Sequence, residues 1–423
     1  MSTPSLWQHA DFLKLWAGQT VSELGSVVTR TAVPLVALLV LGAGPREMAY
    51  LVVAASGAVL LVGLIAGPWV DRLRRRPLMI WCDAARALLL FSIPAAYVTG
   101  TLTLGQLYVV AFAEASLGVV FDAAYPAYVP SLIGADRVLE ANSKLATSSS
   151  IAEVGGPGIA GTLVQLVTAP FAVLVDAVSF VVSAISLVAI RAPELARPAR
   201  AVRLAILREM AEGLGVVRRH PLLFPMALSS LVDHFFGSFY AVVYAIYLLE
   251  ELHLSPFLLG IVISAGGVGS LAGSLVATRV VRRLRFGRTI VLLPVVASAI
   301  GLLTPLAAGP LAIATLMVFL PQLLGDGLQT VAGIARITLR QGVVPDRVLG
   351  RVNATVEVLS HGVGPFGALV AAVVAEQLGV RGAIAIGWLG GSLAVLFLVF
   401  SPLPRVDTPS SWSEERLATG RRA

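Results

Sequence analysis

Charged residues are scarce in this chain of 423 residues, at 13% of the sequence, whereas soluble proteins carry about 25%. Cysteine is almost absent, and the single thiol of Cys82 excludes an internal disulfide framework. Lysine is nearly absent too, since Lys14 and Lys144 are the only two among 31 basic residues. Hydrophobic residues make up 57% of the chain, a composition that predicts a protein built for the lipid bilayer.

The sequence also lacks the residue patterns that hold metals, nucleotides or nucleic acids. Its histidines are scattered without the spacing of metal ligands, at His9, His220, His234, His253 and His361. No Walker A sequence is present, so ATP cannot drive the protein directly. The net charge of +7 comes from arginines in the connectors between apolar stretches, which set membrane topology. We therefore expect no metal, no cofactor and no nucleic-acid partner.

Apolar stretches long enough to cross the hydrocarbon core, which requires about 20 residues, recur along the whole chain. We predict twelve such spans, at residues 14–42, 47–70, 77–99, 104–131, 144–168, 170–190, 221–249, 256–278, 288–308, 311–335, 352–377 and 382–402. This pattern predicts an all-α polytopic membrane protein whose twelve transmembrane helices form two halves of six.

The basic residues of the connectors fall almost entirely on one side of the predicted spans. The connectors after even-numbered spans are rich in arginine, whereas the opposite connectors offer only Arg46 and Arg381. Because basic loops stay in the cytoplasm, both termini and the loop 193–218 are predicted to be cytoplasmic. The first span is too long for the apolar region of a signal peptide, so we expect it in the mature protein. The expected location is the bacterial inner membrane.

The loop 193–218 marks a boundary between two predicted domains. Its second part, residues 202–217, has the pattern of a short amphipathic helix, which we expect to lie along the inner membrane surface. We predict four segments: an N-terminal six-helix bundle at 1–192, a cytoplasmic linker at 193–220, a C-terminal six-helix bundle at 221–404 and a cytoplasmic tail at 405–423.

Two charged connector sequences occur twice, about half a chain length apart. VDRLR at 70–74 returns as VRRLR at 281–285, and DRVL at 136–139 returns identically at 346–349, at offsets of 211 and 210 residues. The apolar stretches around them follow in the same order, so the repeat is direct. Direct repeats in membrane proteins relate two halves by an axis along the membrane normal, with a site between them near the midplane. The repeat therefore indicates a transporter.

The loop between the second and third spans resembles a family motif. The run GPWVDRLRRR from Gly67 to Arg76 is similar to the G-x-x-x-D-R-x-G-R-R motif of the major facilitator superfamily, with Arg74 where that family usually has glycine. The resemblance implies a cytoplasmic charge network in which the aspartate and a following arginine meet an acid low on the fourth helix. It assigns the cytoplasmic gate to Asp71, Arg72, Arg75 and Asp122.

Span five carries a second motif of the same superfamily. The run GPGIAG at 156–161 resembles the G-P-x-x-G-G antiporter motif of its exporters, with Ala160 in place of one glycine. Small residues let helices approach closely, so a packing role is compatible with this resemblance. The motif residues are Gly156, Pro157 and Gly161. The runs 12–18 and 175–180 are similar to the enterobactin-exporter and macrolide-efflux branch of the superfamily.

Acidic residues stand inside four of the spans, at positions that follow the repeat. A charge at mid-span costs about 2.5 to 3.5 kcal/mol on insertion scales, so we expect each acid to serve a function. The resemblance implies that helices 1, 4, 7 and 10 line a central cavity for substrate and protons. In this sequence those spans carry Glu23, Glu114, Asp233 and Asp326, and the partners are 210 and 212 positions apart.

Arg30 is the only base expected at the depth of these acids. Its distance from the cytoplasmic end of its span matches that of Glu114, so we predict an ion pair between the two. Arg30 would keep Glu114 ionised for substrate binding and leave Asp326 as the better proton carrier, because burial favours the protonated form of an unpaired carboxyl group. The remaining intramembrane polar residues are interpreted as packing or paired groups: Glu153, Asp176, His234 and His361.

An acidic cavity with one arginine suits cationic, zwitterionic or neutral amphipathic solutes better than phosphorylated ones. We therefore predict a monomeric secondary active transporter that exports drug-, macrolide- or siderophore-like small molecules in exchange for protons by alternating access. Two alternatives stay open. A membrane-embedded enzyme that modifies lipids would need a nucleophile or a metal cluster, and a transport-inactive scaffold or sensor would not need the cavity acids.

Overall fold

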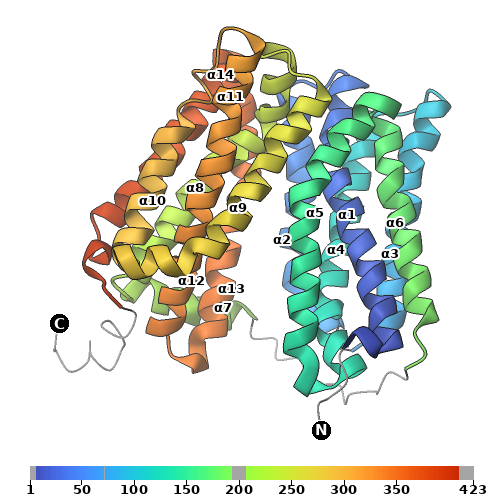
Figure 1. Ribbon diagram of the computed structural model, residues 1–423, viewed down its shortest axis with the longest axis horizontal. Coiled ribbons are helices and arrows are strands. Elements are labelled where there is room, and N and C mark those ends of the chain that lie inside the picture. Colours follow the sequence, from blue (N-terminus) through green and yellow to red (C-terminus); the bar gives the residue numbers. More distant parts are fainter. Residues whose placement is uncertain (1–5, 71, 193–205, 409–423) are drawn as a thin grey trace. The chain divides into compact units, whose positions relative to one another are not determined.

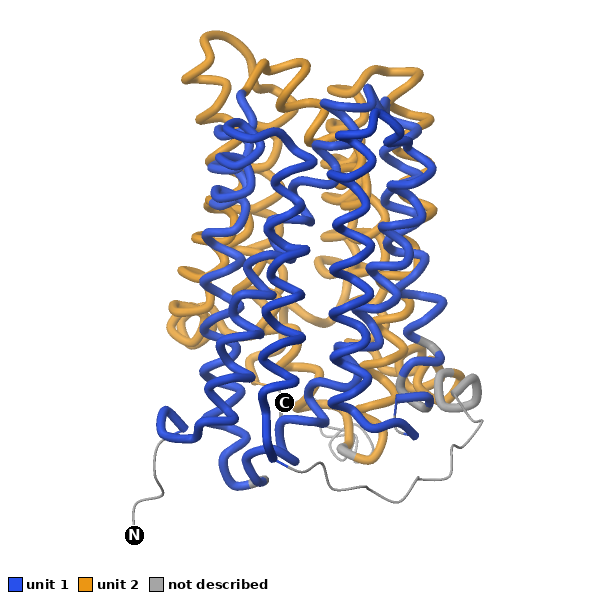
Figure 2. The backbone as a smooth tube through the Cα atoms, turned by 90° about the vertical axis from the view of Figure 1, so that its right-hand side faces the viewer, with its two compact units in different colours: residues 1–202, 255–264 blue, residues 203–254, 265–423 orange. Residues whose placement is uncertain are grey.

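The computed structural model of the chain describes residues 6–70, 72–192 and 206–408. These residues form helices joined by short connections, and none of them belongs to a β-strand. The predicted all-α fold is confirmed. The chain divides into two compact units (Figure 2): unit 1 comprises residues 1–202 and 255–264, and unit 2 comprises residues 203–254 and 265–423.

The described part of unit 1 is a bundle of six long helices, joined by the first turns of a seventh, α9 (Figure 1). Its elements are η1 Leu6–Gln8, α1 Ala10–Leu39, α2 Pro45–Val70, α3 Arg75–Val98, α4 Leu104–Ile133, η2 Ala135–Arg137, α5 Val138–Val167 and α6 Ala169–Ala189, where η1 and η2 are short 3-10 helices. Each of the first six predicted spans coincides with one of the long helices, apart from a few residues at the ends.

Unit 2 continues α9 and holds the helices of the second half of the chain (Figure 1). Its elements are α7 Ile206–Arg219, α8 Leu223–Ile246, the π-helical turn η3 Tyr247–Glu251, α9 Pro256–Leu284, α10 Phe286–Gly301, α11 Leu311–Leu320, the π-helical turn η4 Pro321–Gly325, α12 Asp326–Val343, α13 Asp346–Gly362, α14 Gly364–Val399 and the 3-10 helix η5 Leu403–Arg405. The first part of the predicted linker, 193–205, lies outside the described residues.

Nine helical segments of the described residues are long and apolar enough to cross a membrane. One of them, Arg347–Val399, contains the last two predicted spans, because Gly379 has a φ of 79° and turns the chain between them. Glycine adopts this conformation without the clash of a Cβ atom. Predicted span 288–308 corresponds to the shorter helix α10, and span 144–168 lies in α5, whose first turns are polar. The count of twelve spans stays a prediction.

Within unit 1, α1 and α6 pack closely along small and hydroxylated residues. Gly25 of α1 lies against Ser179 and Asp176 of α6, so a side chain at this position would collide with both. One turn and a half away, Gln19 Nε2 donates a hydrogen bond to Ser183 Oγ at 3.0 Å. Close approach of the two backbones therefore buries polar side chains inside the bundle.

Basic residues near the ends of α1 and α3 bind the last carbonyl groups of α6. Lys14 Nζ donates to the Ala189 carbonyl at 2.8 Å. Arg76 donates through Nε to Leu187 and through Nη2 to Val188, both at 2.8 Å. The last carbonyls of a helix have no partner inside that helix, and cations also suit its negative end. These basic residues thus stabilise the bundle in addition to any role in topology.

Within unit 2, α8 packs against α14, and the glycines of α14 face the phenylalanines of α8. Gly390 lies against the ring of Phe236, and Gly387 lies against Phe239. The missing side chains leave room for the aromatic rings, so the two helices can approach each other. This packing places the aromatic face of α8 beside the cavity described below.

The amphipathic helix that the sequence predicts at 202–217 is observed as α7, in the part that the structure describes. It packs against α13, where Gly213 lies against the backbone of Arg351. Arg351 Nη1 also pairs with Glu212 Oε2 at 2.7 Å, and Val217 is buried in the core of unit 2. A position along the membrane surface stays a prediction.

The helix that supplies Asp326 is widened by one π-helical turn, η4, directly before it. Pro321 begins this turn, and its missing N–H removes one hydrogen bond of a regular α-helix. Gly269 of α9 lies against the Leu323 carbonyl, so α9 approaches the turn closely. Turns of this kind occur frequently at functional sites. Here the turn places both Gln322 and Asp326 on the wall of one cavity.

Candidate functional site

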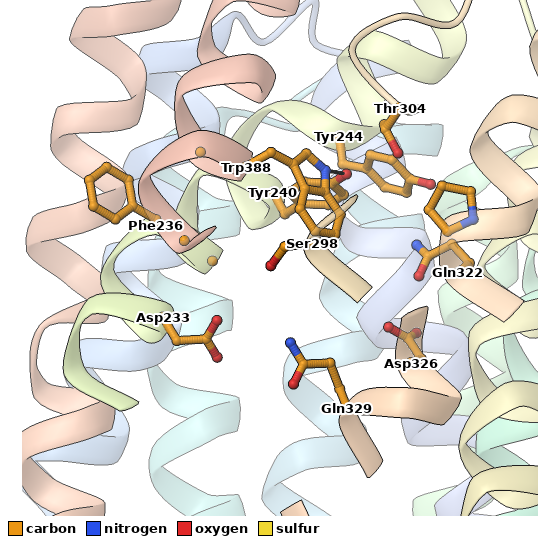
Figure 3. Close-up of a pocket in the computed structure, with 14 residues that line it drawn as sticks. Asp233, Phe236, Tyr240, Tyr244, Ser298, Thr304, Gln322, Asp326, Gln329 and Trp388 are labelled. Atoms are coloured by element: carbon orange, nitrogen blue, oxygen red, sulfur yellow. Dashed lines mark hydrogen bonds between the residues drawn. The ribbon is translucent and has the colours of Figure 1, made fainter. Parts of the chain in front are cut away.

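Unit 2 contains a cavity of about 210 Å³ that is bordered by α8, α10, η4, α12 and α14 (Figure 3). Its walls combine carboxyl groups, carboxamides and aromatic rings. The lining residues are Asp233, Phe236, Gly237, Tyr240, Tyr244, Ser298, Thr304, Pro321, Gln322, Asp326, Gln329, Gly387, Trp388 and Gly391. The cavity is therefore polar and aromatic at once.

Two of the predicted cavity acids, Asp233 and Asp326, line this cavity. Asp233 projects from α8, and its carboxyl group points toward the carboxamide of Gln329 on α12 (Figure 3). Asp326 is the first residue of α12 and packs against Gly266 of α9. It has no ion-pair partner within the described part of the chain. The structure thus brings together the acids of the seventh and tenth predicted spans.

Aromatic side chains form the other wall of the cavity (Figure 3). Trp388 Nε1 of α14 donates a hydrogen bond to the hydroxyl of Tyr240, and the two rings meet edge to face with centroids 5.4 Å apart. The ring of Tyr244 lies 4.8 Å from that of Tyr240. Aromatic faces attract cations through their quadrupole. The two acids and the aromatic wall can therefore act on the same bound cation.

A second cavity of unit 2, of about 190 Å³, carries mainly basic side chains from α8, α12 and α13, together with Glu357. The rings of His234 and His361, which were interpreted as packing residues, contact each other there with centroids 4.7 Å apart. Arg336 also lines this cavity, donates from Nη2 to Gln329 Oε1 at 3.3 Å and interacts electrostatically with Asp233. Arg336 therefore connects the basic cavity to the acidic one.

In unit 1, the predicted ion pair between Arg30 and Glu114 is wrong. Arg30 pairs instead with Glu153 of α5, and their side chains are 58% and 55% exposed. Glu114 pairs with Arg86 of α3, whose Nε lies 3.0 Å from Glu114 Oε1. The reason is the arrangement of the helices, because α1 packs mainly against α5 and α6, whereas α4 packs mainly against α2 and α3. Equal depth in the membrane did not make the two residues neighbours.

Arg86 is a base in the middle of predicted span 77–99, so the prediction that Arg30 is the only base at mid-membrane is also wrong. Its side chain is 12% exposed, and the guanidinium carbon lies 3.9 Å from the centroid of the Phe180 ring. A charge inside an apolar span was visible in the sequence. A charge has a high free energy in the bilayer. A search for charged residues in all of the predicted spans, and not only in four of them, therefore identifies Arg86.

Glu23 lines a separate cavity of about 200 Å³ in unit 1, together with polar side chains of α1 and α5 and with Tyr125 of α4. Ser148 on its wall accepts a hydrogen bond from Trp16 Nε1 at 3.1 Å. Glu114 does not line this cavity. The four predicted cavity acids therefore differ: two share the unit 2 cavity, Glu23 lies in another, and Glu114 is held in an ion pair.

The predicted gate residues are described only in part. Asp71 lies outside the described residues, and Arg72 beside it is exposed. Arg75, the first residue of α3, donates from Nη1 to the Ala127 carbonyl of α4 at 3.1 Å. Asp122 is an exposed residue of the same helix. The loop between α2 and α3 is thus tied to the end of α4 by Arg75, and the charge network through Asp71 stays a prediction.

The antiporter-type motif of α5 forms close helix contacts within unit 1. Gly156 lies against the side chain of Val27 on α1, while Pro157 is buried. Gly161 lies against the Pro256 carbonyl and the backbone of Gly260, at the start of α9. A side chain at either glycine would collide with these neighbours. The small residues therefore allow close packing, and a role of the motif in exchange stays a prediction.

No group of three or more metal-binding side chains occurs in the part of the chain that the structure describes. The unit 2 cavity places carboxyl groups beside aromatic rings and carboxamides, groups that can bind a cation. An organic cation can be held by charge and by ring faces at the same place. A proton can occupy the same carboxyl groups when the cation is absent.

A sequence model of the Major Facilitator Superfamily matches residues 15–364 of the chain. The multidrug efflux pump Tap of Mycolicibacterium fortuitum is 27% identical over 344 residues, which cover 78% of this chain and 81% of Tap. Macrolide efflux protein A of Streptococcus pyogenes is 23% identical over 402 residues, which cover 93% of this chain and 95% of that protein. Both relatives extend through the two halves of the chain.

Among solved structures, a bacterial homologue of the iron transporter ferroportin in the inward-facing state has a TM-score of 0.72 against this chain. The two sequences are 18% identical, and the match covers 93% of this chain and 98% of the homologue. At this identity the likeness concerns the fold. It covers nearly the whole of both proteins.

Proposed function

The chain belongs to the Major Facilitator Superfamily and is a multi-pass membrane transporter of small molecules, not an enzyme, and on this premise we propose that it exports amphipathic organic cations in exchange for protons by alternating access. The family membership excludes the alternative of a lipid-modifying enzyme. The names of two relatives, a multidrug efflux pump and a macrolide efflux protein, support export as the direction.

The observation that carries the proposal is the unit 2 cavity, where Asp233 and Asp326 stand opposite a wall of aromatic rings. A cation over an aromatic face gains about 0.5 to 2 kcal/mol, with the larger values where water is excluded. Asp326 has no ion-pair partner in the described part of the chain, so a bound cation or a proton is needed to neutralise it. Competition between the two ligands for one carboxyl group provides the exchange.

The volume of the cavity limits which part of a substrate it holds. Pockets for drug-sized ligands measure about 300 to 1,000 Å³, whereas this cavity measures about 210 Å³. We therefore assign it the cationic head of a larger amphiphile, such as a protonated amine with one attached ring. The hydroxyl and carboxamide groups of Tyr240, Gln322 and Gln329 would orient that head by hydrogen bonds.

The other predicted site residues have supporting roles in this proposal. In unit 1, Glu23, Glu114 and Arg30 serve as charged groups that contact the substrate at other stages of the cycle. Asp71, Arg72, Arg75 and Asp122 form the cytoplasmic gate, and Gly156, Pro157 and Gly161 let α5 pack closely. The transporter is proposed to act as a monomer in the bacterial inner membrane, with both termini in the cytoplasm. The arginine-rich connectors support this orientation.

Everted inner-membrane vesicles test the proposal. Ethidium, a macrolide and an anionic siderophore would be offered separately under an imposed pH gradient, with and without an uncoupler. We expect uptake of ethidium and the macrolide that the uncoupler abolishes, and we expect Asp326→Asn to remove the proton-driven part. Asp407→Asn, an exposed acid beyond the last long helix, is the matched control. Uptake of the siderophore alone, or uptake that the uncoupler leaves intact, would contradict the proposal.

A further inference from the structure

Inside unit 1 lies a cluster of charged side chains of which the function proposed above uses only Glu114. It is centred on Arg86 of α3, and its acids are Asp83 of α3, Glu114 of α4 and Asp176 of α6. Three carboxyl groups therefore surround one guanidinium group. We refer to these four residues as the Arg86 cluster.

The acids of the Arg86 cluster differ in how they are neutralised. Asp83 is fully buried, and neither of its carboxyl oxygens accepts a hydrogen bond from a residue that the structure describes. The polar groups that act on it are the Ser183 hydroxyl and the Arg86 guanidinium. Asp176 is also fully buried, and among the described residues its Oδ2 has no hydrogen-bond partner, but Ser179 Oγ donates to its Oδ1 at 2.9 Å. Because an unpaired ionised carboxylate is strongly unfavourable in a protein interior, Asp83 is the acid least able to stay charged.

The guanidinium of Arg86 is engaged by Glu114 in this structure. Its Nε and Nη2 lie 3.0 and 2.5 Å from the same oxygen, Glu114 Oε1. Asp83 is three positions before Arg86 on α3, so the two side chains lie on the same face of that helix. The guanidinium therefore stands between two alternative acids, Glu114 on α4 and Asp83 on its own helix.

The helices that pack most closely against α3 are α4 and α6, and the charged groups with which they act on Arg86 are acidic. From α4, both Glu114 and Asp122 act on Arg86, and α6 contributes Asp176. Glu23 of α1 interacts with Arg86 as well, and the Cys82 thiol lies beside Asp83. Arg30 acts on Glu23 and Asp122 but is itself paired with Glu153. The excess of carboxyl groups over guanidinium groups means that the region needs protons to approach neutrality.

We propose that Asp83 is a second proton-binding site of the transporter and that Arg86 operates it. While Arg86 pairs with Glu114, Asp83 carries a proton on one carboxyl oxygen. When the cationic group of a substrate engages Glu114, Arg86 leaves it and pairs with Asp83, whose proton passes to water. One positive charge enters as one proton leaves, so the charge of the cluster is unchanged. The mechanism rests on the proposed function, because its substrate is the same amphipathic cation.

The proton on Asp83 can be observed without any transport. In infrared spectra of the purified protein at neutral pH, a protonated carboxylic acid has a carbonyl band that ionised carboxylates lack. Asp83→Asn should remove the band of one acid, and Asp407→Asn should leave the spectrum unchanged. Glu114→Gln should remove the same band, because the released Arg86 then pairs with Asp83 and displaces its proton. A carboxylic-acid band whose intensity does not fall in folded Asp83→Asn or in Glu114→Gln overturns the proposal, and the second variant decides if the first does not fold.

The exchange itself can be measured with tetraphenylphosphonium as the probe cation, in weakly buffered solution of the purified protein. Wild type should release protons as the probe binds, and Asp83→Asn should bind it and release about one proton fewer per bound cation. Equal release by the two proteins overturns the proposed exchange. If the probe does not bind the wild type, the substrate class of the proposed function fails, and the infrared measurement still decides whether Asp83 holds a proton.

Discussion

The two units carry acids at matching positions of the internal repeat but surround them differently. In unit 1, Glu114 is paired with the mostly buried Arg86. In unit 2, Asp326 stands beside Gln322 and an aromatic wall, with no ion-pair partner in the described part of the chain. The repeat thus determines where an acid lies along its helix, whereas the neighbouring helices determine whether it is neutralised.

This difference indicates that the acid of unit 1 serves mainly stability and the acid of unit 2 mainly ligand binding. An acid that is paired inside a bundle contributes to its stability and exchanges ligands only when its arginine moves. An acid without a partner is available to a ligand at once, and its removal should leave the fold intact. The predictions below test these different roles, from the largest expected effect to the smallest.

The largest effect is expected from Arg86→Gln in unit 1. The substitution leaves Glu114 without its partner, and breaking a buried ion pair destabilises a protein by about 3 to 5 kcal/mol. We expect a clearly lower melting temperature in detergent, whereas Arg86→Lys, which keeps the charge, should lose less. If Arg86→Gln had the same melting temperature as the wild type, the ion pair would not stabilise the bundle, and the contrast between the units would disappear.

Asp326→Asn in unit 2 should have the opposite effect, since it should lower transport and leave stability unchanged or higher. The melting temperature should stay equal or rise, because an unpaired acid is removed from the cavity. Proton-driven uptake of ethidium by vesicles should fall at least about ten-fold, which corresponds to a loss of about 1.4 kcal/mol. Downhill exchange of the dye should remain. A large drop in melting temperature would show that Asp326 has a structural partner after all.

Trp388→Ala should weaken cation binding in the unit 2 cavity. The loss of a cation–π contact worth about 0.5 to 2 kcal/mol corresponds to an increase of about 2- to 30-fold in the Kd of tetraphenylphosphonium. Trp388→Phe, which keeps a ring face but loses the hydrogen bond to Tyr240, should retain most of the affinity. Phe400→Ala, at an exposed position, serves as the control. Equal loss in all three variants would argue against an aromatic wall for the cation.

The two copies of the repeated connector allow a further comparison between the two halves of the chain. Asp71 in the first copy is replaced by Arg282 in the second, so only the first copy carries the acid of the gate motif. Asp71→Asn should lower transport several-fold at normal membrane abundance, because it removes an interaction that is specific to one state. Arg282→Gln should have a weaker effect. Full transport by Asp71→Asn would reduce the loop to a determinant of topology.

The smallest effect is expected from Arg30→Gln. Its pair with Glu153 is more than half exposed, and exposed ion pairs contribute about 0 to 1 kcal/mol. The melting temperature should therefore stay close to that of the wild type, in contrast to Arg86→Gln. Equal destabilisation by the two arginine variants would mean that exposure does not separate the two ion pairs of unit 1.

Most of the helical architecture could be predicted because helices in a bilayer satisfy their own backbone hydrogen bonds, so an apolar run of sufficient length already specifies the element. The predicted spans therefore match the observed helices to within a few residues over most of the chain. The exceptions have local causes. Span ten extends to Val343 through a polar last turn, and the π-helical turn at Pro321 leaves no signature in hydropathy.

The candidate site could be predicted only by residue type and by depth. The sequence by itself determined that acids stand inside the spans, that Asp233 and Asp326 belong to the repeat, and that small residues occupy the motif of α5, because hydropathy and spacing are properties of the chain alone. Tertiary structure alone decided that Arg86 and not Arg30 contacts Glu114 and that Trp388 and Tyr240 line the cavity. It also decided that Asp83 has no hydrogen bond of its carboxyl oxygens within the described residues. The physical reason is that the rotation of each helix about its axis, and the choice of its neighbours, depend on packing between helices that are distant in sequence.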